Sequence, residues 1–193
     1  MYIWEVHGPL YPHLIEVYSL NTNAWRKIDT VSEAMPYYGS EMYLNGTYHW
    51  LACKSILAFD MSHEVFRWMA LPDLGNLRDA STKKSFNVLD TRIAIIVDHV
   101  VEGIEKSFDI WVMREYGVEE SWTKQIKIGP LLGVDRPLGF GNNGNLLLVD
   151  HNGEVVSCDS NTHEIKNLNI RGVPFSLQVI NYVQSLVSVQ GEN

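Results

Sequence analysis

The stretch FDMSHEVF, residues 59–66, has two counterparts of equal length in this chain: YSLNTNAW at residues 18–25 and CDSNTHEI at residues 158–165. Each copy has an apolar anchor at its first position, a polar turn in the middle and a second anchor seven positions after the first. Short apolar segments that flank a polar turn are typical of two antiparallel strands. The recurrence of this hairpin therefore indicates a protein built from repeated β units. The polar turns centre on Asn21, Ser62 and Asn161.

A fourth copy of the hairpin has a longer turn and lies between Trp111 and Trp122. The second anchors of the four copies are 41, 56 and 43 residues apart. Because they hold the same place in each unit, we expect all four to be buried at equivalent positions on successive sheets. These second anchors are Trp25, Phe66, Trp122 and Ile165.

Another hairpin precedes the first one within each unit. Asn45-Gly46 and Asn143-Gly144 each separate two apolar runs, and their glycines lie 20 and 21 residues before the second anchor of the same unit. In the intervening unit, Asp90 occupies the corresponding turn. Asn-Gly is strongly favoured in two-residue hairpin turns, because both residues tolerate a positive φ. Each unit is therefore predicted to contain four short strands.

Four short strands in about 40–45 residues is the period of a β-propeller blade. We therefore predict an all-β fold, a partial (truncated) β-propeller of four-stranded antiparallel blades in one domain over residues 1–193. An antiparallel sandwich is the alternative, since it also has regularly spaced short strands. The predicted units are a half-blade over 1–28, blades over 40–70, 86–128 and 138–170, and a final strand pair over 175–189, so the chain is expected to begin within a blade.

The 193 residues include 15 Lys or Arg and 23 Asp or Glu, which gives a formal net charge of −8. An acidic chain with no basic stripe is poorly suited to nucleic acid or to an anionic membrane, so we expect neither as a partner. No apolar run reaches the roughly 20 residues of a transmembrane helix. Cys53 and Cys158 form neither a disulfide framework nor a metal motif, which favours a reducing compartment, the cytoplasm or the nucleus.

Motifs for catalysis and for metals are weak in this chain. Gly139–Gly144 matches G-x-G-x-x-G, but a strand-like run follows it where a dinucleotide site requires a helix. His49 and Cys53 lie four positions apart on a predicted strand, about 13 Å at 3.3 Å per residue, which is too far to share a metal ion. We expect His49 to be half-buried, and His63 and His163 to be exposed at equivalent turn positions. No catalytic residue, cofactor or metal is predicted.

Several segments resemble the F-box-associated domain of plant F-box proteins, over roughly residues 2–190. IWVMREYGVEESWTK at 110–124 is similar to the family segment WVMKEYGVxESWTK, and EMYLNGTYHWL at 41–51 to its NGxxHWL hairpin. ILAFDMSHEVF at 56–66, with Leu71-Pro72, matches ILxFDxxxExFxxxxLP, while IRGVP at 170–174 and YVQSLV at 182–187 match the closing segment. The resemblance extends to F-box/kelch-type proteins and to the S-locus F-box proteins of pollen.

This resemblance implies a substrate-recognition module of a cullin-based SCF ubiquitin ligase, of general or S-locus type. Its expected partner is the target protein for ubiquitination, and a Skp-type adaptor only if an F-box exists upstream. These residues themselves resemble no F-box, so a non-functional fragment without adaptor binding is one alternative. The others are an enzyme on a propeller scaffold that acts on glycans or redox substrates, and a structural oligomerisation domain.

In a propeller, the links between blades and the middle loop of each blade emerge at the same end. Such loops are longer and more varied in charge than the hairpin turns at the opposite end, which suits target binding. The predicted loops are Asp29–Tyr38, Pro72–Lys84, Asp98–Lys106, Gly129–Pro137 and Asp150–Gly153. The candidate target contacts are Tyr37, Arg78, Asp79, Lys83, Glu102 and Arg136, since aromatic and arginine side chains supply many binding hot spots.

Overall fold

The computed structural model describes residues 2–6, 14–19, 22–28, 36–52, 55–75, 83–100, 105–173 and 176–180. These residues form strands β1 to β15 in four antiparallel sheets, which we call blades 1 to 4. Blade 1 contains β1 (Tyr2–Val6), β2 (Leu14–Ser19) and β3 (Ala24–Ile28). Blade 2 contains β4 (Pro36–Leu44), β5 (Thr47–Ala52), β6 (Ser55–Asp60) and β7 (Val65–Ala70).

Blades 3 and 4 repeat the four-stranded pattern of blade 2. Blade 3 contains β8 (Lys84–Leu89), β9 (Arg92–Val100), β10 (Lys106–Met113) and β11 (Trp122–Leu131). Blade 4 contains β12 (Val134–Phe140), β13 (Leu146–Asp150), β14 (Glu154–Cys158) and β15 (Ile165–Arg171). A 3₁₀ turn, Glu119–Ser121, precedes β11. Across the described ranges, no helix has the length and apolar character that a membrane crossing requires.

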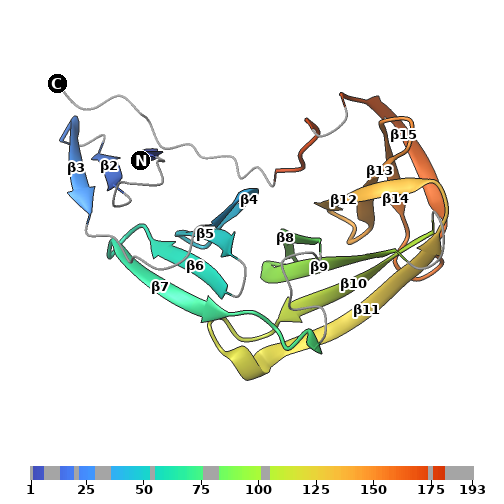
Figure 1. Cartoon of the computed structure of the whole chain (residues 1–193), viewed down its shortest axis with the longest axis horizontal. Helices are drawn as coiled ribbons and strands as arrows, with labels where there is room; N and C mark the ends of the chain where they lie inside the picture. The colour runs from blue at the N-terminus through green and yellow to red at the C-terminus, as the bar shows by residue number, and fades with distance from the viewer. Residues whose placement is uncertain are drawn as a thin grey trace.

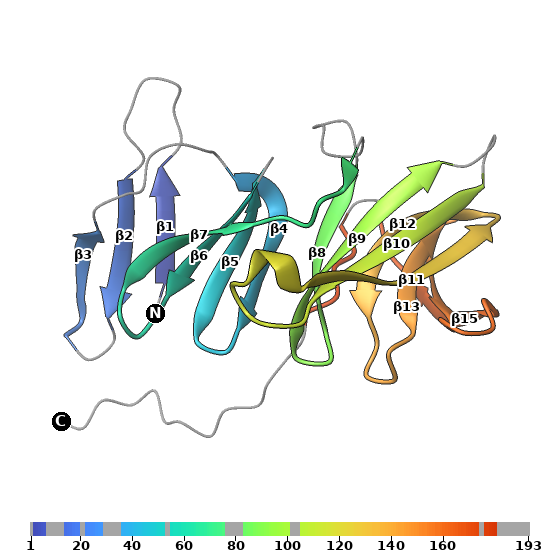
Figure 2. The ribbon, with the colours of Figure 1, turned by 90° about the horizontal axis from the view of Figure 1, so that it is seen from below.

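The four sheets follow one another along an arc (Figure 1). Within each sheet the strands are paired in chain order, so the chain runs from the inner side of the arc to its outer side. Strands β4, β8 and β12 lie on the inner side, and β7, β11 and β15 lie on the outer side (Figures 1 and 2). This arrangement confirms the predicted all-β propeller, because a sandwich would form two packed sheets rather than a series of blades.

The first hairpin of blades 2 and 3 has the turn geometry that the sequence indicates. Asn45 and Gly46 have φ of +49° and +79°, and Asp90 and Thr91 have φ of +48° and +62°. Two successive residues with positive φ give the turn whose twist matches that of the flanking strands. The predicted turn at Asp90 is therefore confirmed, although neither of its residues is glycine.

The second hairpin also repeats at the level of single backbone angles. Asn23, Glu64 and His163, each at the sixth position of the aligned copies, have φ of +49°, +56° and +60°. In two copies the preceding aspartate fixes the turn: Asp60 accepts two backbone N–H groups at 2.8 and 3.0 Å, and Asp159 does so at 2.8 and 2.9 Å. The sequence repeat is thus a repeat of structure.

The prediction that His63 and His163 occupy equivalent turn positions is wrong by one residue. His163 is equivalent to Glu64, the residue with positive φ, whereas His63 precedes that position. The ring of His63 lies 2.9 Å from the carboxylate of Asp60, and the side chain is exposed as expected. Hydrogen bonds from the backbone and ring of His63 lower the pKa of Asp60 to about 2.

Strand β9 is buried on both faces, because it lies between two neighbouring blades. Ile93, Ile95 and Val97 pack in a cluster with side chains of blade 2. Ala94 and Ile96, which point to the opposite face, pack in a cluster with blade 4. The continuous apolar run of β9 follows from this double burial, since neither face of the strand meets water.

Two apolar clusters therefore fill the spaces between blades 2 and 3 and between blades 3 and 4. Each buried side chain of this size stabilises the fold by about 1.5–3 kcal/mol. The first cluster includes Leu51, Ile56, Met69, Phe86, Ile93, Ile95, Met113 and Trp122. The second includes Ala94, Ile96, Phe108, Ile110, Ile128, Val134, Phe140, Leu146, Leu148 and Val156.

The repeating anchors pair across the second hairpin of each blade. The registers join Tyr18 to Trp25, Phe59 to Phe66 and Cys158 to Ile165. In blade 3 the partner of Trp122 is Met113 rather than Trp111. The two strands pair past Trp111 toward the turn, so the anchor that the sequence indicated lies two positions away from the true partner.

The prediction that all four second anchors are buried is confirmed only for Trp122, because Phe66 is half-buried and the other two are exposed. Trp25 is 49% exposed and Ile165 is 44% exposed, whereas Trp122 is 8% exposed. All four lie on the outermost strand of their blade, where burial depends on a neighbouring blade. Trp122 has such a neighbour, because its indole N–H donates to the carbonyl of Ala70 at the end of β7 at 2.9 Å.

Strand boundaries also differ from the predicted loops. Strand β11 extends to Leu131 and β12 begins at Val134, so most of the predicted loop Gly129–Pro137 is strand. Strand β4 likewise begins at Pro36, within the predicted loop Asp29–Tyr38. The predicted final strand pair, 175–189, lies mostly outside the described residues, and 176–180 within it form no strand.

We predict that Trp122→Ala lowers the free energy of unfolding by about 3–5 kcal/mol, because it removes a large side chain between two blades. Urea unfolding followed by circular dichroism measures this change. Trp25→Ala is the matched control: its ring packs on Tyr18 at 5.2 Å but is half exposed, so we expect a cost of about 1 kcal/mol. Equal losses in the two variants would contradict the placement of Trp122 between blades.

Candidate functional site

The two ends of the blades differ in structure. The loop end carries the links between blades and the middle loops, and its described residues are 71–75, 83, 105, 132–133, 151–153 and 172–173. The turn end carries the hairpin turns, with described residues 22–23, 45–46, 60–64, 90–91, 114–121, 141–145 and 159–164. These two ends, and the inner side of the arc between them, are the surfaces on which a partner could bind.

The candidate contacts predicted for the loop end have different positions. Arg78, Asp79 and Glu102 lie outside the described residues, and Tyr37 lies in β4, with a side chain that is also outside them. Lys83 is exposed at the start of β8. A role for these residues in target binding stays a prediction.

Arg136 lies within β12 rather than in a loop. Its guanidinium donates to the backbone carbonyl of Leu177 at 2.9 Å. Since Arg136 is paired with Val149 across β12 and β13, both side chains point to the face of blade 4 away from blade 3. Arg136 therefore holds the segment 176–180 against blade 4.

A buried ion pair joins blades 3 and 4 near the loop end. The ammonium of Lys106 lies 2.9 Å from the carboxylate of Asp98, and both side chains are largely buried. The same ammonium donates to the backbone carbonyl of Asp135 at the start of β12. Removing one partner of such a pair is strongly destabilising, because the other charge is left buried. These groups fix the spacing of the two blades.

A large hollow lies on the inner side of the arc, at the turn end. Its volume is about 880 Å³, and it is framed by the first hairpin turns of blades 2, 3 and 4. Asn45, Thr91 and Asn142 represent these three turns. The segment 176–180 contributes Val179 and Ile180 to the wall. Binding pockets commonly have volumes of about 300–1,000 Å³.

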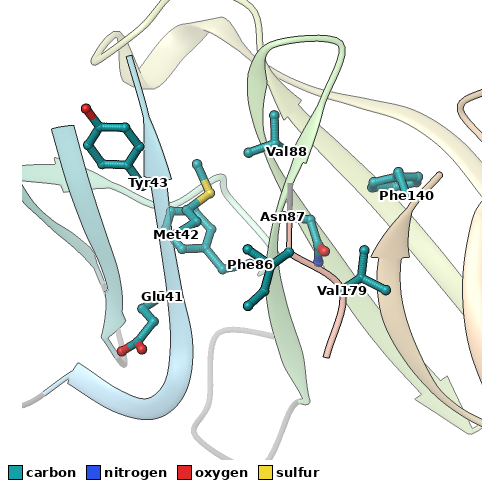
Figure 3. A pocket seen from close by; sticks show the side chains of 9 residues that line it. Glu41, Met42, Tyr43, Phe86, Asn87, Val88, Phe140 and Val179 are labelled. Carbon is teal, nitrogen blue, oxygen red and sulfur yellow. The ribbon is translucent and has the colours of Figure 1, made fainter. Parts of the chain in front are cut away.

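A smaller hollow of about 120 Å³ continues from this site along the inner strands (Figure 3). Figure 3 shows Val88 of β8, Phe140 of β12 and Val179 around it. These side chains and Ile180 line both hollows, so the two form one groove, which we call the inner groove. Its wall is mainly apolar, and Ile180 is 79% exposed at its edge.

One glycine permits the close approach of β12 to β8 behind this groove. A Cβ at Gly139 would lie 2.6 Å from the Oδ1 atom of Asn87, and the φ of Gly139 is +148°. The amide of Asn87 is buried and donates to the hydroxyl of Ser85 at 3.3 Å. Gly139 belongs to the G-x-G-x-x-G match, so its glycine serves packing and not a dinucleotide, since β13 and not a helix follows.

The turn end is acidic. Of its described residues, eight are Asp or Glu, whereas Arg114 is the one Lys or Arg among them. The acidic residues are Asp60, Glu64, Asp90, Glu115, Glu119, Glu120, Asp159 and Glu164. Glu64 is neutralised by Arg26 of blade 1, and Asp90 lines the inner groove. At the loop end, the described charged residues are Asp73, Glu105 and Lys83, so the negative and positive charges nearly balance.

His49 connects blades 2 and 3 beneath the turn end. Its side chain is fully buried rather than half-buried as predicted, because β5 turns it toward blade 3 beside Phe86. Its Nε2 atom lies 2.8 Å from the hydroxyl of Tyr116, in the turn between β10 and β11. Burial lowers the pKa of His49 to about 4 and raises that of Tyr116. The ring is therefore neutral at pH 7, the tyrosine hydroxyl stays protonated, and the two groups share one hydrogen bond.

Among the described His, Cys, Asp and Glu side chains, no group of three or more could hold a metal ion. Cys158 is buried in the cluster between blades 3 and 4, and burial raises the pKa of its thiol. A thiol of this kind is a packing group rather than a nucleophile.

Antiparallel sheets that follow one another along an arc (Figure 1) define a β-propeller fold. A family profile described as the F-box associated beta propeller domain matches residues 5–189. The chain belongs to this family.

Curated relatives agree with this assignment. F-box protein CPR1 of Arabidopsis thaliana is 25% identical over 206 residues, which cover 93% of this chain and 49% of the relative. F-box protein At3g07870 and F-box/kelch-repeat protein At3g23880, from the same plant, are each 27% identical, over 78% and 76% of this chain and 42% and 41% of their own lengths. The chain thus spans less than half the length of these relatives.

The sequence did not indicate the inner groove. Val88 and Phe140 look like ordinary strand residues in the sequence, and Val179 lies about 40 positions beyond Phe140. The first hairpin turns did carry a usable signal, because Asn45-Gly46, Asp90 and Asn143-Gly144 repeat at blade spacing and must therefore meet at one end. We interpreted these residues only as hairpin turns and inferred no common binding surface from them.

We predict that the stability of this fold falls between pH 6.5 and 4 through His49. The folded pKa of about 4 lies below the unfolded value of about 6.5, so the unfolded chain binds the extra proton in this range. The contribution of His49 to the free energy of unfolding is fully present above pH 6.5 and is lost progressively as the pH falls toward 4. At pH 5 we expect a loss of about 2 kcal/mol relative to pH 7, measured by urea unfolding. His49→Gln should remove this part of the pH dependence, and an unchanged profile in that variant would contradict the assignment.

Proposed function

We propose that this chain is the target-recognition part of an SCF-type ubiquitin ligase. The observation that carries the proposal is its membership, over residues 5–189, of a domain family whose matched relatives are named F-box proteins. An F-box docks the Skp-type adaptor of a cullin-based ligase, and the associated domain is left to bind the protein that is to be ubiquitinated. In this assignment the present chain supplies the target site, and the adaptor is contacted only through an F-box segment in the same assembly.

The structure suits a binding role. The blades are joined by buried apolar clusters and by the hydrogen bond from Lys106 to the carbonyl of Asp135, so they hold their ends in a fixed relation. The inner groove combines an apolar wall with amide and hydroxyl groups at its rim. Sites of this composition bind a partner by burial of apolar surface and gain specificity from a few polar contacts. We therefore propose a non-catalytic function.

The general F-box class is proposed ahead of the S-locus type. The three relatives described above are named as F-box or F-box/kelch-repeat proteins, and none is named as an S-locus protein. We also propose that the chain acts in the cytoplasm or the nucleus, where cullin-based ligases operate. Cys158, a buried free thiol, fits a reducing compartment of this kind.

The proposal predicts that an F-box fused before residue 1 turns this chain into a degradation factor. Expressed in plant cells, the fusion should lower the abundance of a small set of proteins, and a proteasome inhibitor should restore them. Quantitative mass spectrometry measures the depletion, with the chain lacking the F-box as the control. A fusion that enters the ligase complex but depletes no protein would overturn the proposal.

A further inference from the structure

We propose that the turn end binds a basic segment of the target protein, with an apolar side chain of that segment in the inner groove. This inference rests on the proposed function and names the chemistry of the partner. It places target binding at the end opposite to the loops that the sequence favours.

The inner groove needs an apolar occupant. Val88, Phe140 and Val179 line it, and Ile180 at its edge is left largely in water. Covering such a side chain is favourable, because apolar surface leaves water. The groove volume of about 880 Å³ can receive a large side chain, or two neighbouring ones, of a bound peptide.

The charge around the groove selects a basic occupant. Asp90 lines the groove, and no Lys or Arg does so. Farther out, Glu115, Glu119 and Glu120 lie exposed on the outer turn of blade 3, and Glu164 lies on that of blade 4. Together with Asp90 they give the turn end a negative potential, which attracts the lysine and arginine side chains of an approaching segment.

A second copy of this chain does not meet these requirements. Its net charge is −8, so two turn ends would repel each other. An acidic target segment is disfavoured for the same reason. A basic peptide with central apolar residues suits both the apolar wall of the groove and the negative charge of the turn end.

Three labelled peptides test the inference by fluorescence anisotropy on the full chain. The first is Lys-Lys-Leu-Phe-Lys-Lys, the second replaces each lysine by glutamate, and the third replaces Leu-Phe by Ser-Ser. We expect the first to bind, with an affinity that falls as salt is raised, and the other two to bind at least tenfold more weakly. Equal binding of the first and second peptides, or no binding of the first, would overturn the inference.

Paired variants of the chain locate the site. Asp90→Asn with Glu120→Gln should weaken binding of the first peptide about fivefold, while the loop-end pair Glu105→Gln with Asp73→Asn, which removes the same charge, should not. Ile180→Ser should weaken it about tenfold, and the matched exposed variant Ile170→Ser on β15 should leave it unchanged. Lys83→Ala probes the loop end that the sequence favours. Stronger losses in the loop-end variants than in the turn-end variants would place the site at the other end.

The same variants in the F-box fusion separate this inference from the proposed function. If the parent fusion depletes proteins and the Asp90→Asn, Glu120→Gln fusion depletes them equally, the turn end is not the target site and only the inference fails. If the parent fusion depletes nothing, the proposed function fails. Loss of depletion in the turn-end variant, with normal depletion in the loop-end pair, supports both.

Discussion

Burial of both faces of a sheet is the constraint on which this structure depends. A short antiparallel sheet with one wet face needs polar residues at alternate positions, and β9 has none between Ile93 and Val97. Its odd-numbered side chains require blade 2 and its even-numbered ones require blade 4. Blade 3 therefore cannot be stable alone, and its two neighbours are held at a fixed distance by the side chains that they share. The inner groove exists because three inner strands are held in this way.

The sequence predicted the parts of the fold that are set by local chemistry. The polar turns of the repeating hairpin impose a positive φ at Asn23, Glu64 and His163, and the same turn chemistry sets the paired φ values at Asn45-Gly46. These features depend on a few adjacent residues, so a repeat in sequence becomes a repeat in structure. The blade count and the antiparallel order follow directly from them. The family resemblance, which rests on the same segments, was confirmed for the same reason.

Features set by neighbours far along the chain were missed. Trp25 and Trp122 hold equivalent places in their hairpins, but only Trp122 meets the end of another blade, at the carbonyl of Ala70. Arg136 was expected in a loop, because Pro137 and Gly133 suggest a break, yet the segment at Leu177 gives its guanidinium a structural partner. Trp122 pairs with Met113 rather than with Trp111, because β10 and β11 stay paired beyond Trp111. In each case the deciding contact comes from a segment that local patterns do not specify.

The separation of roles between the two ends follows from how the blades are connected. At the loop end, Lys106 and Asp98 pair with each other, and the carbonyl of Asp135 accepts from the same ammonium, so charges there serve to hold blades 3 and 4 together. At the turn end, the acidic side chains of the outer turn of blade 3 project into water, and the 3₁₀ turn that carries Glu119 and Glu120 buries none of its residues. A hairpin turn can change its side chains without disturbing the clusters between blades, because the turn lies beyond the paired residues. The charge of Glu119 and Glu120 is therefore free to serve recognition, whereas the charges of Lys106 and Asp98 are committed to the fold.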